Sequence, residues 1–244
     1  MTAHYDTIGV DYAHLRKPDP RIAAAIHTAL GDARSVLNLG AGAGSYEPED
    51  RAVTALEPSA EMIAQRPAGS APVHQGVAED LPFDDNSFDA AMGVLTIHHW
   101  TDQARGLAEM RRVSRGPVVL LTFDPAFQGF WLMDYLPELI SIDDKQMPPL
   151  DFYAAHLGPV AIETVPVPHD CSDGFMGAYW RRPAAYLDPR IRKAISCFWA
   201  MDNVERKLAR LADDLDSGAW SEKYPDLADL EAYDLGYRLI RTTE

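Results

Sequence analysis

Short apolar runs punctuate the first half of the chain. Four of them cover residues 35–39, 52–56, 88–95 and 118–123, and a less apolar fifth run covers 72–77. Runs of this length are typical of strands that are buried on both faces of a parallel sheet. The pattern therefore predicts five strands before residue 125.

The segments between these runs favour helices over 20–30, 59–65 and 101–115. Asp19 and Pro20 stand where a helix N-cap and first turn are expected, and a glycine follows each of the two longer segments. Because strands and helices alternate, we predict an α/β fold with a doubly wound parallel sheet and right-handed crossovers.

Beyond residue 125 the alternation loosens. An aromatic stretch covers 127–135, and strands are expected over 161–167 and 235–240. The segment 168–233 separates those two strands. Within it, four apolar residues fall on one helical face before a stop at Gly218, namely Val204, Leu208, Leu211 and Leu215.

Composition narrows the class of protein. A chain of 244 residues is compatible with one large domain, and its net charge of −15 disfavours nucleic acid and anionic membranes as partners. Cys171 and Cys197 form no metal-ligand spacing, so no metal is expected. No targeting segment or membrane-spanning run is visible, and we expect a cytoplasmic protein with reduced thiols.

A glycine-rich loop follows the first strand. Its glycines at 40, 42 and 44 let backbone N–H groups approach a ligand, and Glu57 ends the next strand 17 residues after Gly40. An acidic residue at that place accepts hydrogen bonds from both hydroxyls of a ribose. The alternative is a tight turn beside a surface carboxylate.

The glycine spacing distinguishes between adenosine cofactors. Nicotinamide dinucleotides favour G-x-G-x-x-G, whereas this loop has G-x-G-x-G followed by Glu47 and Glu49, which form a poor phosphate cradle. S-adenosylmethionine, which has no phosphates, suits the loop better. A nicotinamide-dependent oxidoreductase and a non-enzymatic S-adenosylmethionine-binding regulatory module remain as alternatives.

Several ordered motifs of the chain resemble those of class I S-adenosylmethionine-dependent methyltransferases, in particular the small-molecule group of ubiquinone/menaquinone type. The similarity covers about residues 3–125. It is carried by 36–44 (VLNLGAGAG), 56–59 (LEPS), 76–83 (GVAEDLPF), 87–89 (SFD) and 96–100 (TIHHW).

The resemblance implies a single methyltransferase domain over 1–244 with a Rossmann-like sheet of seven strands. Its last strand, 235–241, would run antiparallel after a return through 161–167. Residues 1–19 would cover the cofactor, 20–125 would form the cofactor-binding core, and 168–233 would be a helical lid over the substrate.

The resemblance also implies contacts to the cofactor. The glycine loop would face the methionine portion, Glu57 the ribose, and Ala78 and Glu79 the adenine. Arg16, with Tyr12, would bind the methionine carboxylate, although a surface arginine is an equal alternative. The full predicted set is Tyr12, Arg16, Gly40, Ala41, Gly42, Gly44, Glu57, Pro58, Ala78, Glu79, Leu81 and Leu95.

Two positions depart from the family pattern. The family usually has Asp where this chain has Asn38, and often has Asp where it has Val77. The second Asp accepts a hydrogen bond from the adenine amino group, so backbone carbonyls would have to replace that contact here.

Chemistry at the acceptor is assigned to two neighbouring histidines. His98 and His99 follow the fourth strand at the ligand-binding edge of the sheet, and a neutral imidazole there can take a proton from a hydroxyl or amine. We therefore favour O- or N-methylation of a small molecule over C-methylation, with His99 slightly preferred as the base. Alternatively, the histidines only pack, and positioning alone accelerates the transfer.

The segment 168–183 is dense in polar and aromatic residues. Such mixtures line specific pockets, or else pair among themselves to hold a lid together. The substrate contacts predicted from it are His169, Asp173, Tyr179, Trp180 and Arg181.

Overall fold

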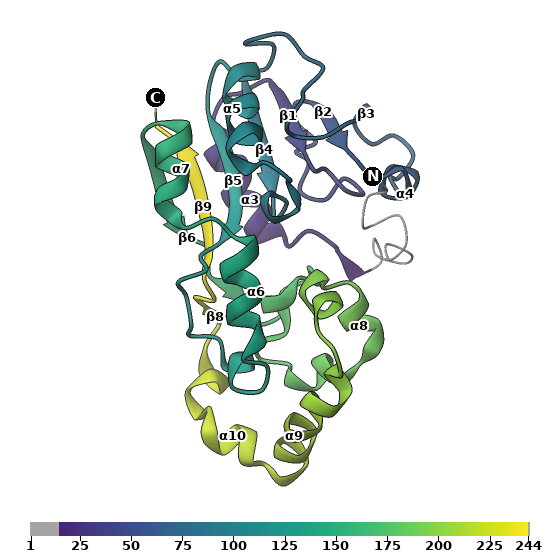
Figure 1. Cartoon of the computed structure of the whole chain (residues 1–244), viewed down its shortest axis with the longest axis vertical. Coiled ribbons are helices and arrows are strands. Elements are labelled where there is room, and N and C mark those ends of the chain that lie inside the picture. The colour runs from purple at the N-terminus through teal and green to yellow at the C-terminus, as the bar shows by residue number, and fades with distance from the viewer. Residues whose placement is uncertain (1–14, 244) are drawn as a thin grey trace.

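A mixed sheet forms the centre of the computed structural model, which describes residues 15–243 (Figure 1). Within these residues the strand order is β3-β2-β1-β4-β5-β9-β6, and β9 runs antiparallel to both of its neighbours. The strands are β1 Ser35–Leu39, β2 Ala52–Glu57, β3 Val73–Gln75, β4 Ala90–Val94, β5 Val118–Phe123, β6 Val160–Thr164 and β9 Tyr237–Thr242. The predicted seven-stranded Rossmann-like sheet with an antiparallel last strand is confirmed.

Helices cover both faces of this sheet. Alternate residues of a strand point to opposite faces, and β5 places Val119 and Leu121 in one apolar core and Val118 and Leu120 in another. The first core contains the apolar face of α3 and the second contains those of α5 and α7. These helices are α3 Pro20–Ala29, α4 Ala60–Ala64, α5 Gln103–Val113, α6 Glu138–Gln146 and α7 Leu150–Leu157.

The first helix begins and ends as its sequence indicates. Asp19 is the N-cap of α3, and its side chain accepts a hydrogen bond from the N–H of Arg21 at 3.0 Å. Ile22 and Ile26 are buried on the sheet side of the helix. Helix α7 and its neighbour α6 were not predicted; α7 is fixed to the sheet by Tyr153, whose hydroxyl hydrogen-bonds Thr122 at 2.8 Å.

The segment between β7 (Val167–Pro168) and β8 (Ala232–Tyr233) forms the lower part of the molecule in Figure 1, and we call it the inserted segment. These two short strands pair antiparallel and bring the ends of the segment together. Between them lie α8 Pro189–Lys193, α9 Val204–Ser217 and α10 Ala219–Lys223. Helix α9 matches its predicted position, with Val204, Leu208 and Leu211 buried and Gly218 at its end.

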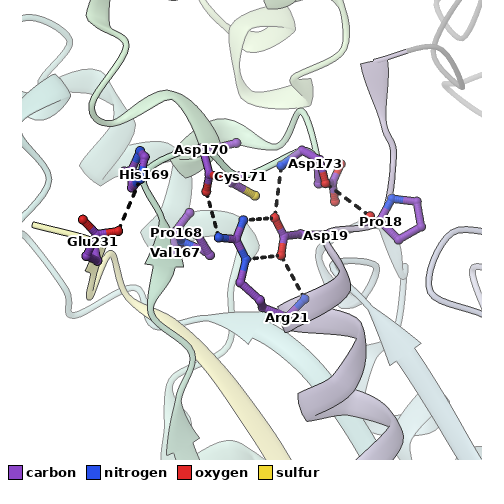
Figure 2. A network of polar contacts seen from close by, with 12 residues as sticks. Pro18, Asp19, Arg21, Val167, Pro168, His169, Asp170, Cys171, Asp173 and Glu231 are labelled. Atoms are coloured by element: carbon purple, nitrogen blue, oxygen red, sulfur yellow. Dashed lines mark hydrogen bonds and ion pairs between the residues drawn. The ribbon is translucent and has the colours of Figure 1, made fainter.

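Polar contacts join this segment to the start of α3 (Figure 2). The carboxylate of Asp19 accepts hydrogen bonds from the Arg21 guanidinium and from the N–H of Ser172 at 3.1 Å. Arg21 also donates to Asp170 at 2.8 Å. Residues 19–21 and 170–172 are therefore held together across the boundary between the sheet and the inserted segment.

Within residues 15–243, no helix combines the length and the apolar character that a membrane span requires.

The buried Asp19 should make stability depend on pH. Burial opposes ionisation of this carboxyl, but hydrogen bonds from Arg21 and Ser172 outweigh burial and lower its pKa from 3.8 to about 2. Because the folded-state pKa is depressed, the resulting stabilisation of about 2 kcal/mol is present above pH 4 and is lost as the pH falls through about 2.

We therefore expect Asp19→Asn to be less stable than the wild type at pH 7, by about 2 kcal/mol. The difference should narrow as the pH is lowered toward 3, where the wild-type carboxyl begins to lose this advantage. Urea unfolding at several pH values measures both free energies. A difference that stays constant from pH 7 to pH 3 would show that the ionised carboxyl does not stabilise the fold.

Candidate active site

A cavity of about 550 Å³ lies where β1, β2 and β4 end. Its walls include the glycine loop after β1, Glu57 at the end of β2, and residues 94–96 after β4. Ligands bind at this edge of open parallel sheets, and small-molecule sites measure roughly 300–1,000 Å³. We call this space the cofactor cavity.

Most of the predicted cofactor-binding residues line the cofactor cavity. Those that do so are Arg16, Gly40, Ala41, Gly42, Glu57, Pro58, Ala78, Glu79 and Leu95. Gly44 instead lies against the Arg66 side chain, and Leu81 is buried with its N–H bonded to Glu109 at 2.9 Å. Tyr12 lies outside the described residues.

The Glu57 carboxylate holds the backbone of the glycine loop in place. One carboxylate oxygen accepts the N–H of Gly42 at 2.8 Å, and the other accepts the N–H of Ser59 at 2.9 Å. A carboxylate can accept about four hydrogen bonds. The buried carboxylate of Glu57 therefore supports the backbone of the glycine loop, and the same residue lines the cofactor cavity.

The ends of β1 and β4 meet in close contact. Gly40 has φ +61°, and a Cβ at this position would lie 1.9 Å from the Thr96 hydroxyl oxygen, so the site requires glycine. Leu95, next to Thr96, has φ +49°, an uncommon conformation for a residue with a side chain. Backbone strain of this kind clusters at functional sites.

A buried cluster explains why Asn38 departs from the family pattern. The Asn38 amide donates to Glu47 at 3.1 Å, and the Arg66 guanidinium donates to both oxygens of Glu47 at 2.9 and 2.8 Å. Arg66 also donates to the carbonyl of Gly42. Glu47 thus supplies the carboxylate, and an Asp at position 38 would place two carboxylates side by side.

An apolar residue lines the cofactor cavity at the position where the family often has Asp. Val77 lines it and is 47% exposed. Burial disfavours ionisation of the neighbouring Glu79, but hydrogen bonds from Asp102 and Thr101 outweigh burial and lower its pKa. The Glu79 carboxylate is thereby engaged with the N–H groups of Thr101 and Asp102.

A second, smaller cavity of about 90 Å³ shares Arg16 and Leu95 with the first. Aromatic, methionine and aliphatic side chains line most of it, together with Arg16 and a few neutral polar side chains, and we call it the apolar cavity. About half of the lining residues come from β5, α6, β9 and three 3₁₀ helices, η2 Trp131–Asp134, η3 Met176–Tyr179 and η5 Ser196–Ala200, and the others come from the segments between elements and from η1 (Ile97–His99). This cavity was not predicted from the sequence. The aromatic stretch 127–135, two of whose residues line the cavity, is the sequence feature that could have indicated it.

The two histidines after β4 line different cavities. They lie on η1 (Ile97–His99) with ring centroids 3.9 Å apart; His98 lines the apolar cavity and His99 the cofactor cavity. His99 is exposed, whereas the Nδ1 atom of His98 is buried. Burial, followed by the nearby His99 and Arg16, holds the pKa of His98 well below its usual 6.5.

The five predicted substrate residues line neither cavity. Trp180 is fully buried and its ring N–H donates to the carbonyl of Val167 at 3.0 Å, while Tyr179 is buried beside it. Arg181 donates to the carbonyl of Leu230, and His169 lies 3.5 Å from Glu231. These side chains hold the inserted segment together.

Asp173 contacts two residues that line the cofactor cavity, Arg16 and Tyr46. Its carboxylate accepts from Arg16 Nε at 2.6 Å and from the hydroxyl of Tyr46 at 2.8 Å. Arg16 and Asp173 also form an isolated β-bridge. The arginine that was expected to bind the methionine carboxylate is therefore paired with an acidic side chain of the inserted segment.

In the part of the chain that the structure describes, no three His, Cys, Asp or Glu side chains gather as a metal site.

The lining of the cofactor cavity fits a cofactor without phosphates. Its charged residues in the described chain are Glu57, Glu79 and Arg16, and Asp173 already pairs with the arginine. A pyrophosphate would meet two carboxylates there, whereas ribose hydroxyls and a sulfonium cation are complementary to them.

Comparisons with known proteins agree with this geometry. The sequence profile of the methyltransferase domain family matches residues 37–120. An uncharacterized methyltransferase of Mycobacterium tuberculosis is 42% identical over 91 residues, which cover 34% of this chain and 36% of that protein. A ubiquinone/menaquinone biosynthesis C-methyltransferase of Citrifermentans bemidjiense is 30% identical over 134 residues, which cover 45% of this chain and 57% of that protein.

One solved structure matches nearly the whole chain. The crystal structure of a putative methyltransferase from an antibiotic biosynthesis pathway of Anabaena variabilis superimposes with a TM-score of 0.87 at 35% identity, over 94% of this chain and 99% of that one. Fold and site together define an S-adenosylmethionine-dependent methyltransferase. The chain belongs to this family, and the predicted family and cofactor are confirmed.

Removal of the Glu57 carboxylate should weaken cofactor binding. We expect Glu57→Ala to raise the Kd of S-adenosylhomocysteine by an amount equivalent to about 1–3 kcal/mol, the range for a lost hydrogen bond to a charged group. Titration calorimetry measures this change. Glu49→Gln, which removes one exposed negative charge near the same loop, is the matched control and should bind as the wild type does. Equal affinity of Glu57→Ala and wild type would exclude Glu57 from the ribose site.

The cluster of Asn38, Glu47 and Arg66 should make the protein less stable if it contains two carboxylates in place of one. Asn38→Asp removes the amide donor from Glu47 and adds a like charge beside it, so we expect a loss of about 1–3 kcal/mol of stability. Adding Glu47→Gln to this variant should recover much of the loss, because a donor and a single carboxylate are restored. Thermal unfolding of the two variants checks this, and an Asn38→Asp protein as stable as the wild type would contradict it.

Proposed function

We propose that this methyltransferase transfers the methyl group of S-adenosylmethionine to an oxygen or nitrogen atom of a small molecule. The observation that carries the proposal is that the cofactor cavity and the apolar cavity share Arg16 and Leu95 in their walls. A cofactor in the first and an acceptor in the second would face each other across these two residues.

The chain's contribution to such a transfer is mainly positioning. S-adenosylmethionine, when bound, supplies an electrophilic methyl group on a sulfonium sulfur. Glu57 and the glycine loop are the groups suited to hold its ribose and methionine portions. Holding two reactants in a reactive orientation is worth roughly 7–11 kcal/mol. The inserted segment, tied to the sheet through Arg16 and Asp173, covers the apolar cavity and limits access of water.

A proton acceptor completes the proposal. An oxygen or nitrogen acceptor releases a proton as its new bond to carbon forms, and a neutral imidazole accepts protons near neutral pH. His98 lines the apolar cavity and His99 lines the cofactor cavity, so the pair supports O- or N-transfer. The relative from Citrifermentans bemidjiense is a C-methyltransferase by name, and product analysis distinguishes transfer to carbon from the proposed transfer.

A small molecule is favoured over a macromolecule by charge and by shape. The net charge of −15 disfavours a nucleic-acid acceptor. The apolar cavity, at about 90 Å³, admits only a small compound or a small group.

Incubation with S-adenosylmethionine and a panel of small hydroxyl and amine compounds tests the proposal. We expect at least one compound to yield S-adenosylhomocysteine and an equal amount of product methylated on oxygen or nitrogen, as measured by mass spectrometry. Glu57→Ala should reduce the yield, and Glu49→Gln should not. Tight binding of S-adenosylhomocysteine without product from any compound would instead favour a regulatory cofactor-binding module.

A further inference from the structure

The histidine of the apolar cavity has no hydrogen bond from the described part of the chain. His98 lines this cavity, and its Nδ1 atom is buried without a partner in residues 15–243. A buried polar group that is left unpaired costs about 1–3 kcal/mol, and native proteins contain few of them. Because the ring lines the apolar cavity, a ligand bound there, with a small rearrangement of the ring, is the partner that we consider for it.

The apolar cavity offers no unpaired charge to that ligand. Of its lining residues in the described chain, only Arg16 is permanently charged. The Asp173 carboxylate accepts hydrogen bonds from Arg16 Nε at 2.6 Å and from Arg16 Nη2 at 3.4 Å. Asp173 is 1% exposed and also accepts the hydroxyl of Tyr46. A carboxylate, phosphate or ammonium group in the cavity would lose its hydration without gaining a counterion.

Aromatic side chains form one wall of the apolar cavity. Tyr237 lies edge-on to Phe175 and Phe123, with ring centroids 4.7 and 5.6 Å away. Such rings prefer to stack against, or to meet edge to face, another aromatic ring. This part of the wall is therefore suited to a flat aromatic acceptor.

The volume of the apolar cavity and its flexible methionines limit the size of the acceptor. The cavity of about 90 Å³ is smaller than the ~150 Å³ that holds a benzene ring in a protein core. Met133, Met147 and Met176 line it, and methionine side chains rearrange readily to fit a ligand. A single ring is thus the largest group that modest rearrangement of these side chains accommodates.

We propose that the acceptor is an uncharged, single-ring hydroxyl compound of phenol type, which occupies the apolar cavity and donates its hydroxyl hydrogen bond to His98. This assignment rests on the methyl transfer proposed above. The acceptor oxygen bonds to the methyl carbon as the carbon–sulfur bond breaks, the hydroxyl proton passes to His98, and His98 then releases that proton to solvent. Because burial keeps the imidazole neutral at pH 7, the ring retains the lone pair that this step requires.

Three probes of one ring size but different charge test the assignment. Phenol, benzoate and benzylamine are titrated by calorimetry into the full chain saturated with S-adenosylhomocysteine. We expect phenol to bind at least tenfold more tightly than either charged probe. In protein labelled with ¹⁵N-histidine, phenol should also shift the nitrogen resonances of His98, which are identified by their absence from a His98 variant.

Variants separate a hydrogen bond from packing. His98→Phe should weaken phenol binding about five- to tenfold, as expected for the loss of one hydrogen bond of about 1 kcal/mol. His98→Gln keeps a neutral polar group and should recover part of this loss. His156→Phe, which changes an exposed histidine of α7 outside both cavities, should bind phenol as the wild type does.

The outcomes distinguish this inference from the function on which it rests. Benzoate or benzylamine binding as tightly as phenol, no detectable phenol binding, or an unshifted His98 resonance would each overturn the acceptor assignment while S-adenosylhomocysteine still binds. Failure of S-adenosylhomocysteine itself to bind would overturn the proposed function as well.

Discussion

The ion pair between Arg16 and Asp173 is the interaction on which the two-cavity arrangement depends. It joins the segment before α3 to the inserted segment, and Tyr46 adds a third partner from the loop after β1. Loss of one member of a buried pair leaves an uncompensated charge, which typically costs about 3–5 kcal/mol. Because Arg16 lines both cavities, the ion pair places a neutralised charge, and not a free one, in the wall that the two cavities share.

Acidic side chains hold the backbone around the cofactor cavity. Glu57 accepts N–H groups from the glycine loop and from Ser59, Glu79 accepts those of Thr101 and Asp102, and Glu47 is held beneath the loop by Arg66. These acidic side chains, which are unfavourable for phosphate-bearing ligands, therefore stabilise the loops around the cavity. The same acids make the cavity complementary to a cofactor with a ribose and a sulfonium cation.

The sequence was sufficient for the elements whose signals are local. The strand over 35–39, the glycine loop, Glu57 and helix α9 follow from neighbouring residues, and each is present in the structure. The apolar cavity could not be predicted, because its wall joins residues as distant as Phe123, Phe175 and Tyr237. The polar and aromatic density of 168–183 was ambiguous for a similar reason, since tertiary packing alone decides whether side chains such as Trp180 face a ligand or the interior.

A crystal structure with S-adenosylhomocysteine would show whether the cofactor cavity presents the reacting group to the apolar cavity. We predict that the ribose hydroxyls bind Glu57 and that the sulfur lies beside Leu95 and Arg16, directed toward His98. A ligand bound in the same cavity with its sulfur beside Val77, or bound elsewhere on the chain, would contradict this prediction.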